Sequence, residues 1–278
     1  MWTPRAASDE DLRVDDALIM GIVNVTPDSF SDGGLFLEPD AAIEHGRRLA
    51  AEGAGILDIG GESTRPGAAP VSAGEELERV IPVVEGLADD GPAISIDTMK
   101  ASVAREALSA GATIVNDVSA LRFDPELAGV AAEAQATCVL MHMLGEPRTM
   151  QDDPHYDDVV SEVKAFLEER LAFAVAEGIA LERIWLDPGI GFGKTLEHNL
   201  TLIERLDEIA AIGRPVVFGA SRKSFLEKLT GRRVDERLAG TIAANIIAYE
   251  RGARVFRVHD VAPTFDALKV AAATVGRR

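Results

Sequence analysis

The sequence contains very little cysteine: Cys138 is the only one in 278 residues. A single cysteine excludes a disulfide within the chain and a cysteine metal cluster. It favours a reducing compartment, so we expect a cytoplasmic protein. Cys138 lies in the apolar run 137–141, which predicts a buried and unreactive thiol.

Long hydrophobic runs are also missing. No apolar run has the roughly 18 residues that a membrane-spanning helix needs. Residues 1–16 are charged and polar, without the apolar segment of a secretion signal. We therefore expect no membrane association. Because no linker or shift in composition divides the chain, we expect an N-terminal arm, 1–16, followed by one domain, 17–278.

Basic residues are outnumbered by acidic ones. The chain has 28 Lys and Arg against 46 Asp and Glu, which gives a net charge of −18. A field of this sign repels nucleic acid and anionic membranes, so neither is an expected partner. An anionic substrate would need a local cluster of basic side chains.

Several familiar catalytic motifs are absent as well. There is no His–Glu zinc motif and no serine elbow between a strand and a helix. The glycine-rich segment 187–194 lacks the spacing of a Walker phosphate loop, although its glycines let the backbone or Phe192 approach a flat ligand closely. His142 ends an apolar run, where packing and a site role are both open.

What the chain does contain is a regular alternation of apolar runs and helical patterns. The runs are short and rich in Val, Ile and Leu, which is typical of strands buried on both faces. They lie at 18–25, 55–60, 93–97, 112–116, 137–142, 184–187, 215–219 and 254–258. Helical periodicity is clearest at 41–52, 75–88, 102–109, 126–133, 159–177, 200–209, 237–249 and 262–274. Glycines stand where five of these helices should end, as C-terminal caps do: Gly53, Gly111, Gly178, Gly213 and Gly252.

Eight strand–helix units joined by right-handed crossovers make a parallel sheet. Eight units in this length fit a single α/β domain of the (β/α)8 TIM-barrel type, which typically has ~250 residues. An open, doubly wound sheet is the alternative.

Polar side chains follow nearly every predicted strand. They are Asn24, Asp58, Glu62, Thr64, Asp97, Asn116, His142, Asp187, Ser221, Lys223, Arg257 and His259. In a (β/α)8 barrel the active site lies at the C-terminal ends of the strands. One such residue can simply cap the following helix, and for Asp97 this alternative stays open. Their recurrence predicts a site.

The acidic and amide members predict a heterocycle as ligand. Asp97, Asn116 and Asp187 end buried strands, and a partly desolvated carboxylate needs hydrogen-bond donors. A flat ring with an amidine-like edge offers two donors to one carboxylate.

The basic members predict an anion beside the heterocycle. They are Arg65, Arg222, Lys223, Arg257 and His259. Segment 221–224 opens a helix, whose free N–H groups favour an anion. Together with anionic ligand oxygens, the amide oxygen of Asn24 can help to hold Mg2+.

Seven segments in order along the chain resemble the dihydropteroate synthases of the pterin-binding barrel family. They are 24–34 (NVTPDSFSDGG), 58–67 (DIGGESTRPG), 95–98 (SIDT), 116–117 (ND), 186–193 (LDPGIGFG), 219–225 (GASRKSF) and 257–259 (RVH). The resemblance implies a transferase of folate biosynthesis. Such an enzyme joins a pterin methyl diphosphate to 4-aminobenzoate and releases diphosphate, with Mg2+ as cofactor.

The resemblance also implies roles for individual residues. The pterin pocket would contain Asp97, Asn116, Met141, Asp187, Phe192, Gly219, Lys223 and Arg257. The diphosphate site would contain Asn24, Thr64, Arg65, Arg257 and His259, with the metal at Asn24. The 4-aminobenzoate pocket would contain Phe30, Pro66, Lys223 and Ser224. The catalytic residues would be Asp32, Lys223 and Arg257.

Residues 26–34 are then expected to act as a lid that brings Phe30 and Asp32 to the second substrate. The resemblance further implies a homodimer formed through the outer helices. Phe30 and Pro66 make sulfonamide sensitivity the default hypothesis. Two alternatives are a methyltransferase on the same barrel and a catalytically silent protein that only binds pterin.

Overall fold

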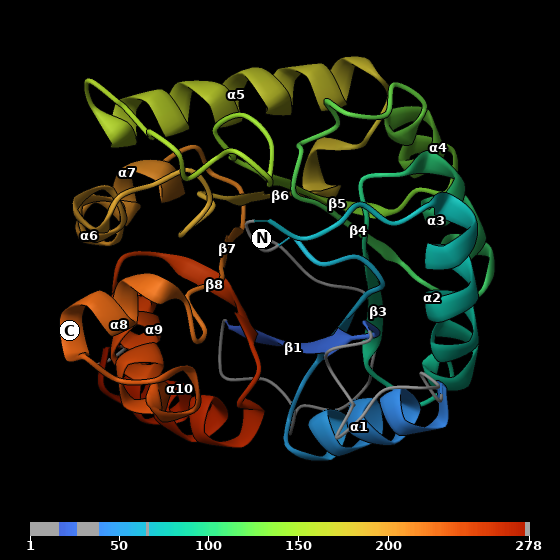
Figure 1. Ribbon diagram of the computed structural model, residues 1–278, viewed down its shortest axis with the longest axis horizontal. Coiled ribbons are helices and arrows are strands. Elements are labelled where there is room, and N and C mark those ends of the chain that lie inside the picture. The colour runs from blue at the N-terminus through green and yellow to red at the C-terminus, as the bar shows by residue number, and fades with distance from the viewer. Residues whose placement is uncertain (1–16, 27–38, 65–66, 276–278) are drawn as a thin grey trace.

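The computed structural model describes residues 17–26, 39–64 and 67–275. Their strands form one closed barrel in the order β1 to β8, with every neighbouring pair parallel. Helices surround this barrel (Figure 1). The predicted (β/α)8 fold is confirmed, and the open doubly wound sheet is excluded.

The strands match the predicted apolar runs to within two residues at each end. They are β1 (Leu18–Asn24), β2 (Ile56–Gly60), β3 (Ala93–Asp97), β4 (Ile114–Asp117), β5 (Thr137–Met141), β6 (Ile184–Asp187), β7 (Val216–Phe218) and β8 (Ala253–Val258).

The barrel interior has an apolar floor. Met20, Ile56, Ile114, Val139, Trp185, Val217 and Val255 form one buried cluster there. Successive side chains of a strand alternate between its two faces, so a residue two positions further on enters the same interior. Two positions after Ile56, Trp185 and Val255 the strands carry Asp58, Asp187 and Arg257. The floor therefore supports a polar layer nearer the C-terminal ends of the strands.

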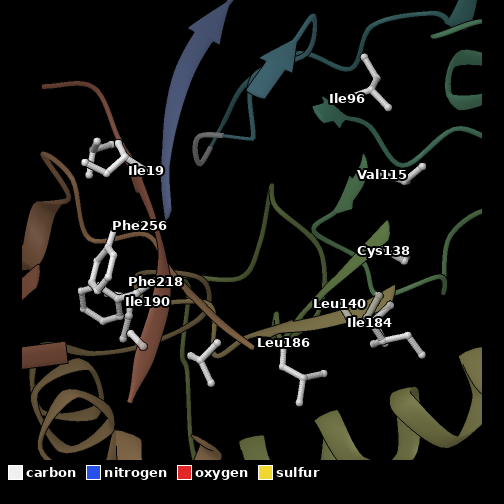
Figure 2. Close-up of a cluster of buried hydrophobic side chains, with 14 of the residues drawn as sticks. Ile19, Ile96, Val115, Cys138, Leu140, Ile184, Leu186, Ile190, Phe218 and Phe256 are labelled. Atoms are coloured by element: carbon white, nitrogen blue, oxygen red, sulfur yellow. The ribbon is translucent and has the colours of Figure 1, made fainter. Parts of the chain in front are cut away.

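The alternate positions point outward and form the main hydrophobic core. Ile96, Val115, Leu186 and Phe256 are fully buried between strands and helices. Figure 2 shows these and further members of the cluster around the strands, Cys138 among them. The predicted burial of Cys138 is confirmed, and this burial raises the pKa of its thiol.

The helices also follow the predicted pattern, with two additions. They are α1 (Pro39–Ala51), α2 (Ala73–Leu87), α3 (Ala101–Ser109), α4 (Leu127–Glu133), α5 (Val159–Ala176), α6 (Leu196–Glu204), α7 (Leu206–Ala210), α8 (Ser224–Thr230), α9 (Leu238–Glu250) and α10 (Val261–Val275). The five glycines predicted to follow helices all have positive φ.

The helix predicted over 200–209 is wrong in both its start and its continuity. It begins at Leu196 because Thr195 caps it: the Thr195 side chain accepts from His198 N, and His198 Nδ1 accepts from Thr195 N. It is interrupted at Arg205, whose φ of −108° and ψ of 27° are not helical. The Arg205 guanidinium pairs with Asp158 and Glu208.

None of the helices in the described parts of the chain is long and apolar enough to cross a membrane. The predicted arm, residues 1–16, lies outside the described residues, so its boundary at residue 16 stays a prediction.

Candidate active site

Arg257, on β8, is held by two carboxylates from other strands. Its Nε donates to Asp58 Oδ2 at 2.6 Å, and its Nη2 donates to Asp97 Oδ2 at 2.7 Å. Burial alone would lower the pKa of Arg257, but Asp58 and Asp97 raise it above its ordinary value. The guanidinium is therefore a fixed positive charge in this part of the barrel.

Asp58 lies deepest in this group and is completely buried. It accepts from Ser95 Oγ at 2.6 Å and from Asn116 Nδ2 at 3.2 and 3.3 Å. With Arg257 it therefore has three donors from three strands. Sequence reasoning placed Asp58 among the strand ends but gave it no role in the site. Its position two residues after Ile56, on the same face of β2, was the available signal.

Asp97, at the end of β3, does not cap the next helix. Helix α3 begins after Lys100 without a side-chain cap, and Ala101 N donates to Asp124 Oδ2 at 2.8 Å. Burial raises the pKa of Asp97 to about 7, partly offset by Arg257 and reinforced by Asp58. Desolvation without full compensation is characteristic of functional carboxylates.

The strand register brings the predicted residues of β1 to β4 to one level. Asn24 pairs with Gly60, Gly60 with Asp97, and Asp97 with Asn116. On the neighbouring strands β5 and β6, Met141 pairs with Asp187. Met141 and Phe192 belong to one apolar cluster, which gives this side of the mouth a hydrophobic wall.

Asp187 and Lys223 form the opposite charged side. Asp187 is 6% exposed and accepts from Gly189 N at 2.7 Å, and burial raises its pKa. Burial lowers the pKa of Lys223 to about 8, against the opposing effect of Asp187. Lys223 Nζ donates to Ile190 O and lies 4.5 Å from the centroid of the Phe192 ring. A side chain at Gly219 would meet Lys223 and Arg257, because its Cβ would stand 3.9 Å from Lys223 Nζ and 3.8 Å from Arg257 Cβ.

The glycine-rich loop 187–194 is held from several sides. Asn199 Oδ1 accepts from Gly191 N at 2.7 Å, and Gln151 Nε2 donates to Gly191 O at 2.6 Å. Tyr156 donates its hydroxyl to Gly193 O at 2.8 Å. Gly189 has a φ of +68°, and a Cβ there would come within 1.9 Å of His142 O. Only glycine fits at that position.

His142 lies against Lys194, the last residue of this loop, and sequence reasoning gave Lys194 no role. Its Nζ is 2.9 Å from His142 Nδ1 and donates to Phe192 O at 3.0 Å. Burial and the nearby Lys194 lower the pKa of His142 to about 2, so this imidazole is neutral. His142 also packs edge-on against Phe166. Of the two open roles for His142, the structure therefore favours packing.

The basic side of the site differs in part from the prediction. Ser221 Oγ lies 2.9 Å from His259 Nδ1 and accepts from His259 N at 3.2 Å. Arg222, predicted to face an anion, instead makes a two-pronged ion pair with Asp260 at 3.0 and 2.6 Å. Its φ of +58° belongs to the turn before α8. Ser224 is the first residue of α8 and is exposed.

The remaining predicted residues cannot all be placed. Thr64 is half-buried in the loop after β2. Phe30, Asp32, Arg65 and Pro66 lie outside the described residues. Among those that are described, no group of three or more His, Cys, Asp or Glu side chains could hold a metal ion.

The C-terminal mouth of this barrel brings together acceptors on β3, β4 and β6 and cations at β7 and β8. This arrangement is typical of a ligand-binding enzyme. A family model described as "Pterin binding enzyme" matches residues 20–259. The dihydropteroate synthase of Escherichia coli K12 is 48% identical over 94% of this chain and 92% of its own.

Solved structures agree with this assignment. The dihydropteroate synthase of Yersinia pestis with a sulfonamide drug has a TM-score of 0.90 and 44% identity, over 95% of this chain and 96% of that one. That of Xanthomonas albilineans with 4-aminobenzoic acid has a TM-score of 0.88 and 51% identity, over 94% and 93%. The chain belongs to the pterin-binding enzyme family and, within it, to the dihydropteroate synthases, which are transferases of the folate pathway.

Proposed function

We propose that this chain joins 6-hydroxymethyl-7,8-dihydropterin diphosphate to 4-aminobenzoate, forming 7,8-dihydropteroate and diphosphate. The main support for this proposal is that the acceptors Asp97, Asn116 and Asp187 lie at the same barrel mouth as Lys223 and Arg257. A pterin presents an amino group and ring N–H groups to such acceptors, and carboxylates bind a two-donor edge with paired hydrogen bonds. Phe192 and Met141 supply the apolar contact for the ring face.

The reaction is proposed to be dissociative. The C–O bond to the diphosphate breaks first, and its electron pair leaves with the diphosphate. The pterin methylene carbon is then cationic, and Asp97 and Asp187 stabilise this charge through the ring. The amine nitrogen of 4-aminobenzoate attacks that carbon and loses a proton to solvent. No strong protein nucleophile is needed, which suits the composition of the site.

The donor chemistry fits Mg2+ bound together with the substrate. Mg2+ keeps several waters and commonly takes one or two protein oxygens plus phosphate oxygens. Asn24 offers one such oxygen at the end of β1, and the described residues hold no closed set of metal ligands. When bound, Mg2+ would neutralise charge on the leaving diphosphate. Arg257 and His259 are proposed to bind the same diphosphate, with Thr64 and Arg65.

The 4-aminobenzoate pocket is proposed to contain Phe30, Pro66, Lys223 and Ser224, with Asp32 acting in the reaction. The support is the motif resemblance, since only Lys223 and Ser224 lie within the described residues. The Xanthomonas relative with 4-aminobenzoic acid supports the same second substrate. A sulfonamide should then compete with 4-aminobenzoate, which is checked by a rise in the apparent KM for 4-aminobenzoate.

The deciding assay is diphosphate release from the purified chain. Release should require both pterin diphosphate and 4-aminobenzoate, and dihydropteroate should form in equal amount. Pterin binding without release would instead support a silent binding protein. Methyl transfer from a methylated folate would support the methyltransferase. Either outcome contradicts the proposal.

A homodimer and a cytoplasmic location complete the proposal. Helices α9 and α10 pack against each other on the outside of the barrel. Exposed apolar side chains lie on both: Ile247 on α9 is 45% exposed and Val270 on α10 is 67% exposed. These side chains support association through the outer helices. Light scattering should give twice the 29.6 kDa chain mass, and a monomer mass would contradict it. Cell fractionation checks the location.

A further inference from the structure

Asp58, on the inner face of the barrel, is sealed from solvent, with 0% exposure. Its hydrogen-bond partners in the described residues are Ser95 Oγ, Asn116 Nδ2 and Arg257 Nε, and all three are donors. Both oxygens of its carboxylate therefore accept hydrogen bonds from the protein itself. Because it is buried and saturated, Asp58 is not positioned to bind a ligand.

Asp58 decides which end of the Asn116 amide can face a ligand. The amide carries donors on Nδ2 and an acceptor on Oδ1. Nδ2 lies 3.2 and 3.3 Å from the two Asp58 oxygens, a place that Oδ1 could not take without repulsion. The orientation of the amide therefore follows from the chemistry of the two groups as well as from the distances between them. The atom left for a ligand is the acceptor Oδ1.

The same carboxylate orients Arg257. Asp58 accepts from Nε, and Nη2 then donates to Asp97 Oδ2 at 2.7 Å. One buried group thus fixes an acceptor on β4 and a cation on β8 at once.

We propose that Asp58 is a positioning residue that sets ligand specificity: it turns Asn116 so that the mouth presents three acceptors in a row, Asp97, Asn116 Oδ1 and Asp187. A ring with several donors along one edge is then selected, and an acceptor facing Asn116 is rejected. The inference deepens the proposed function and rests on it for the identity of the ring as a pterin.

The test compares two replacements of Asn116. If this residue only supplied an acceptor, Asn116→Asp would bind pterin diphosphate as well as the wild type and better than Asn116→Ala. If Asp58 orients it, the new carboxylate faces Asp58 and like charges repel. Asn116→Asp should then bind at least ~tenfold more weakly than Asn116→Ala in calorimetry at pH 8.

The exchanged variant D58N/N116D provides the rescue. The amide introduced at position 58 can donate to the carboxylate at position 116, whose other oxygen faces the ligand, and the total charge is unchanged. Its affinity should exceed that of Asn116→Asp by at least ~tenfold. Acid should also rescue Asn116→Asp relative to the wild type, since a shared proton restores the donor to Asp58. Asp90→Asn, the same change in an exposed ion pair with Arg47, is the control and should bind normally.

The midpoints of thermal unfolding, measured without ligand, compare the same variants independently of the substrate. The midpoint of Asn116→Asp should lie below that of Asn116→Ala, and the exchanged variant should lie above Asn116→Asp. The inference is overturned if the exchanged variant neither binds pterin diphosphate more tightly than Asn116→Asp nor has a higher thermal midpoint. The same holds if neither of these two variants folds. A wild-type protein that does not bind pterin diphosphate would refute the proposed function alone, because the midpoints still test Asp58.

Discussion

The surroundings of Asp97 disfavour its negative charge. A carboxylate in such surroundings is stabilised when a ligand donates hydrogen bonds to it. Its only hydrogen-bonding side-chain partner in the described residues is Arg257. A ligand with two donors can compensate the desolvation that the protein leaves uncompensated. The place of Asp97 at a strand end was enough to predict it as a site residue. Its pairing with Arg257 on β8 could be recognised only from the closed barrel.

Asp97→Ala should remove pterin binding. Two charge-assisted hydrogen bonds would be lost, and each contributes about 1.5–3 kcal/mol, so affinity should fall by roughly 100-fold or more. Calorimetry with pterin diphosphate measures this directly. Near-normal affinity would show that Asp97 does not contact the ring.

Asp97→Asn should reveal the cost of the wild-type charge. Burial raises the folded-state pKa from 3.8 to about 7. The folded state therefore favours the protonated form of Asp97. The contribution of this protonated acid to the free energy of unfolding is complete below about pH 4 and is lost as the pH rises through about 7. The variant should gain stability relative to the wild type between pH 4 and pH 8, by a few kcal/mol. Urea unfolding at both pH values checks this, and a constant difference would contradict it.

Asp32→Ala separates chemistry from binding. If Asp32 acts on the cationic intermediate, kcat should fall far more than pterin affinity, by about 10²-fold or more. Steady-state kinetics and calorimetry on one preparation give both quantities. Equal losses in turnover and affinity would count against a role in the transition state.

At the scale of elements, the strands were predictable and some helix ends were not. Buried parallel strands are apolar on both faces, so each run stands out in the sequence. Helix α6 was placed too late because the usual capping box has Glu or Gln at its third helical residue, where this chain has His198. The contacts around loop 187–194 come from Gln151, Tyr156 and Asn199, and no local pattern predicts them.

Gly189→Ala tests how rigid that loop is. The added methyl would stand 1.9 Å from His142 O, whereas at Gly145, which has the same φ of +68°, nothing lies within 4 Å. Gly145→Ala therefore measures the backbone cost alone, about 1–2 kcal/mol. Gly189→Ala should cost on the order of 3 kcal/mol more and weaken pterin binding. Equal unfolding free energies for the two variants would mean that the loop can move aside.

At the scale of the whole molecule, the pairing across the barrel was the part that sequence could not supply. Asp58 and Arg257 are separated by 199 positions, and Asp97 and Arg257 by 160. Strand ends predict which residues share a mouth, but their partners depend on barrel closure and register. The ring of candidates was therefore predictable, while the network within it was not.

The net charge of −18 should appear in the kinetics. Both the protein and the diphosphate substrate are negative, so long-range repulsion slows their encounter at low salt. The Debye length falls from about 30 Å at 0.01 M to about 8 Å at 0.15 M, while the partly buried Lys223 and Arg257 are screened much less. At constant Mg2+, kcat/KM for the pterin substrate should rise by about twofold to fivefold over this range of KCl. A fall would mean that the local cations dominate the encounter.

The position of Arg257 on the last strand has a consequence for the timing of synthesis. β8 lies beside β1 (Figure 1) and pairs with it to complete the barrel. Arg257 belongs to this last strand. A growing chain on the ribosome holds Asp58, Asp97 and Asn116 long before it holds their cation. Pterin therefore cannot template the early stages of folding, and it can protect only chains whose translation has passed the eighth strand.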